Sequence, residues 1–173
     1  MPVESQLNPS ARYQLVPRTL IFIRCAEYFL LIKGAQSKRI WANLYNGIGG
    51  HIEQGEGYLK AAQRELLEES GLSVENLWLA GVITVDTGRD PGIVIFVLTG
   101  EIPEPDHSVP PAVLSSAEGS LEWITLERLQ ALPVVEDLPV LLDIVRFMKP
   151  GDTPFSARYS YTDRGKLEIE FER

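Results

Sequence analysis

The segment that most constrains the fold is residues 49–72, where a glycine-rich loop leads into a strongly predicted helix. Residues 57–70 are rich in good helix formers, and Gly71 follows them, where a left-handed glycine commonly ends a helix. At about 100° of rotation per residue, three carboxylates share one face of this helix, within an arc of about 100°. They are Glu65, Glu68 and Glu69.

An apolar stripe lies beside the acidic face and consists of Leu59, Ala62 and Leu66. It predicts that the helix packs on a sheet. Three carboxylates so close together repel one another unless a cation lies between them, and oxygen ligands suit Mg²⁺ or Mn²⁺. The alternative is a solvated helix with an acidic outer face, which composition alone favours.

The spacing of the glycines, the arginine and the carboxylates favours the metal site over the solvated face. It resembles the Nudix box, G-x5-E-x7-R-E-U-x-E-E-x-G-U with U aliphatic. The matching positions are Gly50, Glu56, Arg64, Glu65, Leu66, Glu68, Glu69, Gly71 and Leu72. The resemblance is close over residues 46–72 and looser from about residue 17 to residue 148.

This resemblance implies an α/β fold of the Nudix type, an α/β/α sandwich with a mixed β-sheet between helices. It implies a single domain over residues 1–173, with a core at about 17–148 and a C-terminal extension at 149–173. Nudix enzymes hydrolyse a nucleoside diphosphate linked to another group, X, with the help of a divalent metal. The expected cofactor is therefore Mg²⁺, with Mn²⁺ as a substitute.

The resemblance also implies roles for individual residues. The implied metal ligands are the three carboxylates of the helix and the carbonyl of Gly50, and the pair that fixes the loop to the helix is Glu56 and Arg64. The general base is either Glu65 or Glu118, because the family uses a glutamate of the box or one on a distant loop. The alternative for Glu118 is a plain solvated loop residue.

The loop sequence NGIGG, at residues 46–50, resembles that of diphosphatases that remove oxidised purine nucleoside triphosphates. In those enzymes the asparagine faces the base, so Asn46 is a candidate substrate contact, since an amide offers both a donor and an acceptor. Gly49 and Gly50 allow a ligand to approach the backbone closely. The alternative for Asn46 is a purely structural turn before glycine.

An acidic pair, Glu136 and Asp137, lies where those diphosphatases carry carboxylates that also read the base, and at least one of the two is expected to cap the following helix instead. The expected reaction converts a purine nucleoside triphosphate, oxidised or not, to the nucleoside monophosphate and pyrophosphate. The alternatives are cleavage of ADP-ribose, a nucleotide sugar or a capped RNA, and a sensor that binds a nucleotide without cleaving it.

Apolar runs predict strands at 18–25, 28–34, 79–87, 92–102 and 121–126. A second helix is predicted from a stripe of apolar residues at helical spacing, which are expected in the core. They are Leu141, Ile144, Val145 and Met148. The tail alternates apolar and polar residues on either side of DRG, which predicts a terminal β-hairpin. This hairpin either covers an edge of the sheet or pairs with a second subunit in a homodimer.

The net charge and the cysteine content limit the expected binding partners and the expected cellular location. The net charge of −8 argues against sequence-independent binding to duplex nucleic acid, and no segment is long and apolar enough to suggest a membrane partner. The lone cysteine, Cys25, cannot form an intramolecular disulfide, so a reducing, cytoplasmic location is expected. The expected partner is a small nucleotide, whose phosphates have candidate contacts in Arg18, Lys33, Arg39 and His51. The alternative for each of these residues is an exposed surface position without a role in binding.

Overall fold

A computed structural model describes residues 12–103, 111, 113 and 116–172. The helices and strands in that part of the chain are β1 Leu15–Cys25, β2 Tyr28–Gly34, β3 Tyr45–Asn46, α1 Tyr58–Ser70, β4 Trp78–Val85, β5 Gly92–Glu101, β6 Gly119–Thr125, α2 Leu126–Leu129, α3 Leu138–Val145, β7 Phe155–Tyr161 and β8 Leu167–Glu172. Each expected strand and both expected helices are present. The sequence analysis missed β3 and α2, because elements this short carry no periodic pattern.

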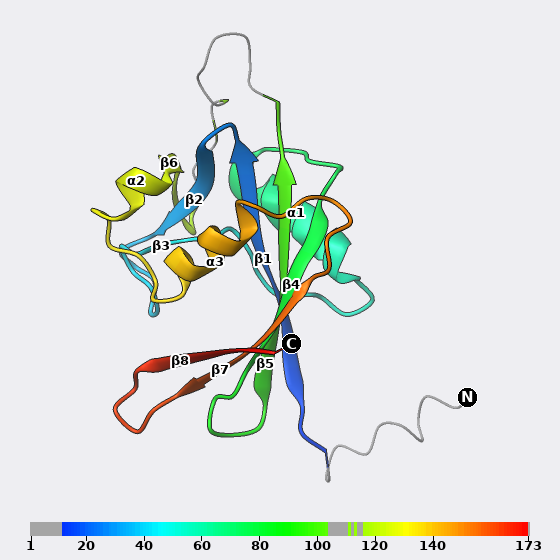
Figure 1. The fold of residues 1–173 in the computed structure, drawn as a ribbon, viewed down its shortest axis with the longest axis vertical. Coiled ribbons are helices and arrows are strands. Elements are labelled where there is room, and N and C mark those ends of the chain that lie inside the picture. The colour runs from blue at the N-terminus through cyan, green and yellow to red at the C-terminus, as the bar shows by residue number, and fades with distance from the viewer. Residues whose placement is uncertain (1–11, 104–110, 112, 114–115, 173) are drawn as a thin grey trace.

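The described strands form one mixed sheet (Figure 1). Their order is β3-β2-β1-β5-β4-β7-β8, and β6 pairs with β2. β1 forms an antiparallel hairpin with β2. It also pairs in parallel with β5, from Leu15 beside Gly92 to Arg24 beside Glu101. This long parallel pair forms the centre of the sheet.

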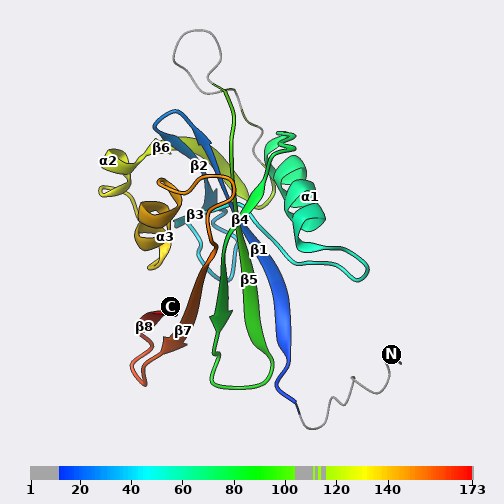
Figure 2. The ribbon, with the colours of Figure 1, turned by 45° about the vertical axis from the view of Figure 1, so that its right-hand side comes forward.

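Helices cover both faces of this sheet, α1 on one face and α3 with the short α2 on the other (Figures 1 and 2). Buried side chains alternate along β1: Leu20 and Phe22 join the core on the α3 side, whereas Ile21 and Ile23 join the core on the α1 side. A strand buried on both faces needs a continuous apolar sequence, which β1 has over residues 20–23. The expected α/β/α sandwich is confirmed.

α1 ends where the sequence predicts. Gly71 has a φ of 74°, and its N–H donates to the carbonyl of Leu67. The buried face of the helix consists of Ala61, Ala62, Leu66, Glu69 and Ser70. Leu59, expected on this face, is exposed, because it lies in the first turn, ahead of the part that packs on the sheet. No helix in the described ranges is long and apolar enough to cross a membrane.

The C-terminal strands β7 and β8 form the predicted antiparallel hairpin. β7 also pairs in parallel with β4, from Phe155 beside Gly81 to Tyr159 beside Val85. The hairpin therefore extends the main sheet and covers the edge that β4 would otherwise expose. Pairing with a second subunit stays a prediction.

Candidate active site

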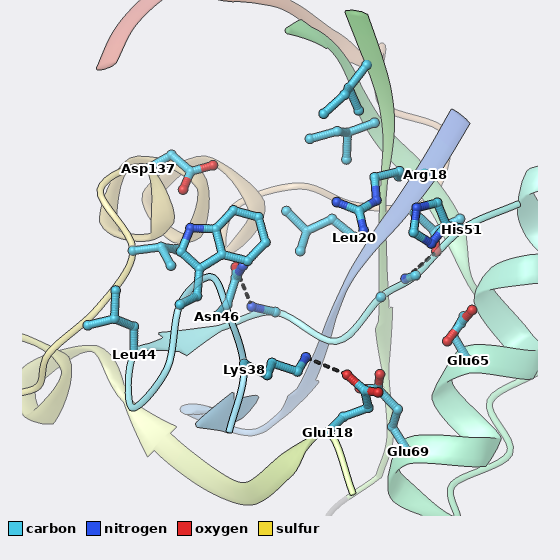
Figure 3. Close-up of a pocket in the computed structure, with 18 of the residues that line it drawn as sticks. Arg18, Leu20, Lys38, Leu44, Asn46, His51, Glu65, Glu69, Glu118 and Asp137 are labelled. Carbon is cyan, nitrogen blue, oxygen red and sulfur yellow. Dashed lines mark hydrogen bonds and ion pairs between the residues drawn. The ribbon is translucent and has the colours of Figure 1, made fainter. Parts of the chain in front are cut away.

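One pocket of about 920 Å³ brings together most of the residues that the sequence singles out. Its acidic end is formed by α1 and by the turn before β6, and it carries Glu65, Glu69 and Glu118 (Figure 3). Its opposite end is formed by β3 and the start of α3, and it carries Asn46 and Asp137 (Figure 3). Pockets for small molecules typically enclose roughly 300–1,000 Å³, so this one has room for a nucleotide.

The glycine-rich loop lies between β1 and α1 and is held close to both. It exchanges backbone hydrogen bonds with β1, among them one of 2.9 Å from the Thr19 N–H to the Gly50 carbonyl. A Cβ at Gly49 would overlap the backbone of Thr19, and a Cβ at Gly50 would overlap the carboxylate of Glu65. The two adjacent glycines therefore permit two separate close approaches, one to the strand and one to the helix.

Arg64 joins the loop to the helix. Its Nε and one terminal nitrogen each donate to Glu56 at 3.0 Å, which is the two-point pairing that a guanidinium and a carboxylate favour. The other terminal nitrogen donates to Glu65 at 2.8 Å and to Glu68 at 3.4 Å. The terminal nitrogen that pairs with Glu56 also donates to the His51 carbonyl at 3.1 Å. The hydrogen bonds from Arg64 hold the pKa of Glu56 below its usual range.

Glu69 is the buried carboxylate of the acidic end, with only 7% of its surface exposed. Burial and the neighbouring charge of Glu65 raise its pKa to about 7. Its Oε2 has no hydrogen-bond partner among the described residues. Because an unpaired buried carboxylate oxygen is costly, this atom fits a cation that approaches from the pocket.

The carboxylates of α1 do not converge on one point. Among the residues that the structure describes, no three His, Cys, Asp or Glu side chains form a group ready to hold a metal ion. Arg64 binds Glu65, and the Glu68 side chain is 60% exposed. The donor set nevertheless fits a divalent cation, since it offers the unpartnered oxygen of Glu69 and the second lone pair of the Gly50 carbonyl.

Glu118 lies in the turn that enters β6 and is fixed there by its backbone. Its N–H donates to Ser116 Oγ at 3.1 Å, and its carbonyl accepts from the Ala35 N–H at 2.9 Å. Its carboxylate is 2.6 Å from the ammonium of Lys38, which also lines the pocket. The sequence analysis missed Lys38, because nothing in its local pattern distinguishes it from the other polar residues of the same turn.

The segment between β2 and β3, residues 35–44, reaches both ends of the pocket. Lys38 lies at the acidic end and Leu44 at the opposite end (Figure 3). Trp41 also lines the pocket, with a left-handed φ of 62° that a bulky residue rarely adopts. A backbone hydrogen bond of 3.0 Å from the Gly34 N–H to the Leu44 carbonyl closes the base of the segment.

Asn46, in β3, faces the pocket (Figure 3). Its Oδ1 accepts a hydrogen bond of 2.7 Å from the Gly47 N–H, which is the turn-forming contact of the structural alternative. This contact does not take the side chain out of the pocket. The amide retains its two N–H donors for other contacts.

Asp137 occupies the N-cap position of α3 but does not cap it. Its φ of −88° and ψ of −17° are helical, whereas a capping residue is normally extended, and its side chain makes no cap hydrogen bond. The expectation that one residue of the acidic pair caps this helix is wrong for this reason. Burial and the charge of Glu136 raise the pKa of Asp137, which lies beside the hydroxyl of the buried Tyr159.

The candidate phosphate contacts divide into two groups. Arg18 and His51 line the pocket near its acidic end (Figure 3). Lys33 lies over the ring of Tyr45, with its ammonium 5.7 Å from the ring centroid, and neither Lys33 nor Arg39 lines the pocket. A ligand in this pocket can therefore meet Arg18 and His51 but not the other two.

The C-terminal hairpin supplies pocket residues that the sequence analysis missed. They are Tyr159, Tyr161 and Leu167. The place of the hairpin depends on the parallel pairing of β7 with β4, a contact between distant segments. No local pattern in the tail indicates that contact, so its aromatic residues cannot be assigned to the pocket from sequence.

The chain matches a model of the NUDIX domain over residues 15–143. It is 31% identical to the oxidized purine nucleoside triphosphate hydrolase of Mus musculus over 133 residues, which cover 75% of this chain and 81% of that protein. The matched region includes the loop, the helix and both ends of the pocket except for the C-terminal hairpin.

Solved structures share the fold. A MutT protein from Bacillus halodurans superposes with a TM-score of 0.71 at 22% identity, over 91% of this chain and 98% of that one. The NUDIX domain of Shewanella oneidensis NrtR, determined with ADP ribose, gives a TM-score of 0.67 at 18% identity, over 84% and 97% of the two chains. This chain therefore belongs to the Nudix family and is a pyrophosphohydrolase that acts on the phosphorus anhydrides of nucleoside diphosphate derivatives.

Proposed function

We propose that this protein hydrolyses purine nucleoside triphosphates, including oxidised ones, to the nucleoside monophosphate and pyrophosphate, with Mg²⁺ as the metal and Mn²⁺ as a substitute. The observation that carries the proposal is the single pocket that joins the acidic end to an end containing Asn46 and Asp137. The name of the mouse relative, an oxidized purine nucleoside triphosphate hydrolase, supports the same substrate class.

At the acidic end, the metal would be held by Glu65, Glu68, Glu69 and the Gly50 carbonyl. When bound, a divalent metal neutralises charge on the phosphates and lowers the pKa of water. Arg64 orients the acidic end by forming ion pairs with Glu65 and Glu68.

The general base is Glu65 or Glu118, both of which line the acidic end. Each carboxylate has one oxygen engaged by a cation: Arg64 binds Oε1 of the first, and Lys38 binds Oε2 of the second. Each therefore retains a second oxygen that can accept a proton from the attacking water.

At the opposite end, the amide of Asn46 and the carboxyl of Asp137 would read the edge of the base. Burial raises the pKa of Asp137, whose carboxyl can accept hydrogen bonds from a base and, when protonated, can also donate one. Trp41 and Tyr161 offer aromatic surface for the base and sugar. This combination of apolar surface with a few polar groups is typical of a nucleoside site.

The test is to incubate the protein and Mg²⁺ with ordinary and 8-oxo purine triphosphates, ADP-ribose, a nucleotide sugar and a capped RNA, and to identify the products. We expect monophosphate and pyrophosphate from the triphosphates. Asp137→Ala should raise the KM for purine triphosphates by roughly tenfold, as expected for the loss of one buried hydrogen-bonding contact. Asp143→Ala is the matched control, because Asp143 is an exposed carboxylate of the same helix outside the pocket.

Other products would identify the alternatives. Turnover of ADP-ribose or capped RNA without turnover of any triphosphate would contradict the proposed substrate. Tight nucleotide binding without any turnover would indicate a sensor.

A further inference from the structure

Lys38 is a cation at the acidic end of the pocket that the Nudix box does not supply. Its ammonium is 2.6 Å from the carboxylate of Glu118. It also acts electrostatically on Glu69, and Figure 3 shows the three side chains together. Lys38 therefore interacts with two carboxylates from different parts of the fold, Glu118 before β6 and Glu69 in α1.

The surroundings of Glu69 indicate that the acidic end of the pocket is a binding site for a cation. Its side chain is buried and aimed into the pocket, yet its Oε2 has no hydrogen-bond partner among the described residues. The ammonium of Lys38 is engaged by Glu118 and leaves this oxygen unsatisfied. The acidic end is thus arranged to receive a further cation.

We propose that Lys38 is a positioning residue that holds Glu118 in the metal-free site, and that it leaves Glu118 for the phosphates of the substrate when a divalent metal binds. The inference rests on the proposed function, because it takes the acidic end to be the metal site. The exchange restores charge balance: the metal gains Glu118 as a neighbour, and the ammonium gains the phosphates.

The ion pair is suited to such an exchange. The side chains of Lys38 and Glu118 are 34% and 55% exposed, and ion pairs this exposed add little to stability. The lysine is flexible and carries a strongly hydrated point charge, so it can change partners without moving the backbone. Breaking the pair therefore costs less than breaking the two-point pair of Arg64 with Glu56.

A purely structural role is the competing explanation for this pair. The turn that carries Lys38 is already joined to the turn that carries Glu118 by the hydrogen bond from the Ala35 N–H to the Glu118 carbonyl. The lysine side chain is not needed for that join. A structural role and a positioning role also predict opposite changes in metal affinity when the charge is removed.

The experiment compares Lys38→Met with Lys38→Arg and with Lys60→Met. Lys60 is an exposed residue of α1 outside the pocket, so its variant carries the same change of net charge elsewhere. Binding of Mn²⁺ without nucleotide is followed by the paramagnetic resonance signal of the free ion, at about pH 8.5, above the Glu69 pKa of about 7 in the wild type. The KM for GTP is measured at saturating Mg²⁺, and thermal unfolding reports on the fold.

We expect Lys38→Met to bind Mn²⁺ about three- to tenfold more tightly, because one repelling charge beside a divalent ion is removed. The same variant should show a KM for GTP raised by about three- to tenfold, because the phosphates lose a cation. Lys38→Arg and Lys60→Met should behave like the wild type in both measurements.

Unchanged or weaker Mn²⁺ binding by Lys38→Met would overturn the inference while leaving the proposed function intact, provided that the wild type binds Mn²⁺ and hydrolyses GTP. Lower affinity for both metal and GTP together with a lower unfolding temperature would also overturn it, in favour of the structural role. A wild type that binds no Mn²⁺ and hydrolyses no triphosphate would refute the proposed function, and the inference with it.

Discussion

Adjacent glutamates of α1 lie in contrasting surroundings. Successive residues of a helix are rotated by about 100°, so Glu68 points toward solvent while Glu69 is turned to the buried face. Only the second carries a large desolvation penalty, which is the main reason that its pKa is raised. The Nudix box thus determines which positions of α1 carry carboxylates. The packing of α1 on the sheet determines which of these carboxylates is buried.

Replacing Glu69 with Gln should remove a pH dependence from the stability of the metal-free protein. The folded-state pKa of about 7 exceeds the ordinary value of 4.5, so the stabilisation from this group is complete below about pH 4.5 and is lost as the pH rises through 7. Between these limits, the free energy of unfolding of the wild type should fall relative to that of the variant by roughly 1–3 kcal/mol. Urea unfolding in the presence of a chelator measures this difference.

Parallel stability curves for wild type and Glu69→Gln would show that the carboxylate is not desolvated in the free protein. A further comparison uses Mg²⁺, which should stabilise the wild type above pH 7 and have much less effect on the variant. Equal stabilisation of both proteins would remove Glu69 from the metal site.

At the residue scale, the sequence predicts those contacts that join two positions of the Nudix box. The pairing of Arg64 with Glu56 follows from the box and is present in the structure. Lys38 and Tyr159 could not be predicted, because each reaches the pocket only through the packing of an otherwise unremarkable turn or strand. That Asp137 does not cap α3 could not be predicted either, because sequence position does not reveal its helical φ and ψ.

At the scale of elements, the glycine-rich loop is defined by what it touches on each side. Gly49 lies against the backbone of β1, which cannot move aside, whereas Gly50 lies against the end of the flexible Glu65 side chain. The same substitution at two neighbouring positions should therefore damage different properties of the protein.

Gly49→Ala should lower the stability by about 2 kcal/mol or more, because its Cβ meets the backbone of Thr19. Gly50→Ala should unfold nearly as the wild type does but lose at least about tenfold in kcat, because Glu65 must leave its place. Gly57→Ala is the control, since its Cβ would meet nothing within 4 Å. Thermal unfolding and steady-state kinetics measure both effects, and loss of stability without loss of kcat in Gly50→Ala would contradict the assignment.

The start of β1 is a boundary that the local sequence pattern does not predict correctly. The sequence predicts that the first strand begins at residue 18, directly after Pro17, which has no N–H to donate. In the structure β1 begins at Leu15, since its first residues pair with β5 on one side and not with β2, which reaches only Ile23–Cys25. A missing donor is tolerated where one side of a strand lacks a regular partner.

At the scale of the whole molecule, two parallel pairings organise the sheet: β1 with β5, and β4 with β7. The sequence predicts the strands and the mixed sheet but not these partners, because parallel neighbours are distant in the chain and leave no local signal. The second pairing brings the C-terminal hairpin to the pocket. Thus a segment outside the family match at 15–143 forms part of the pocket wall.

Tyr161→Ala should raise the KM for a purine triphosphate by roughly three- to tenfold, because aromatic surface beside the nucleoside is lost. Stability should change little, since Tyr161 is 53% exposed. Mn²⁺ binding should also be unchanged, because the proposed metal ligands belong to other elements. The control is Phe147→Ala, which removes an exposed aromatic residue outside the pocket. A KM equal to that of the wild type would exclude the hairpin from substrate binding.

The hydrogen bond between Gly34 and Leu44 closes the base of the segment 35–44 whatever side chains lie between them. The segment nevertheless reaches the acidic end through Lys38 and the opposite end through Leu44. A surface loop with a fixed base tolerates changes of sequence and length better than the core does. Changes of sequence between Lys38 and Leu44 are therefore a route to altered selectivity, provided that Lys38 keeps its place beside Glu118.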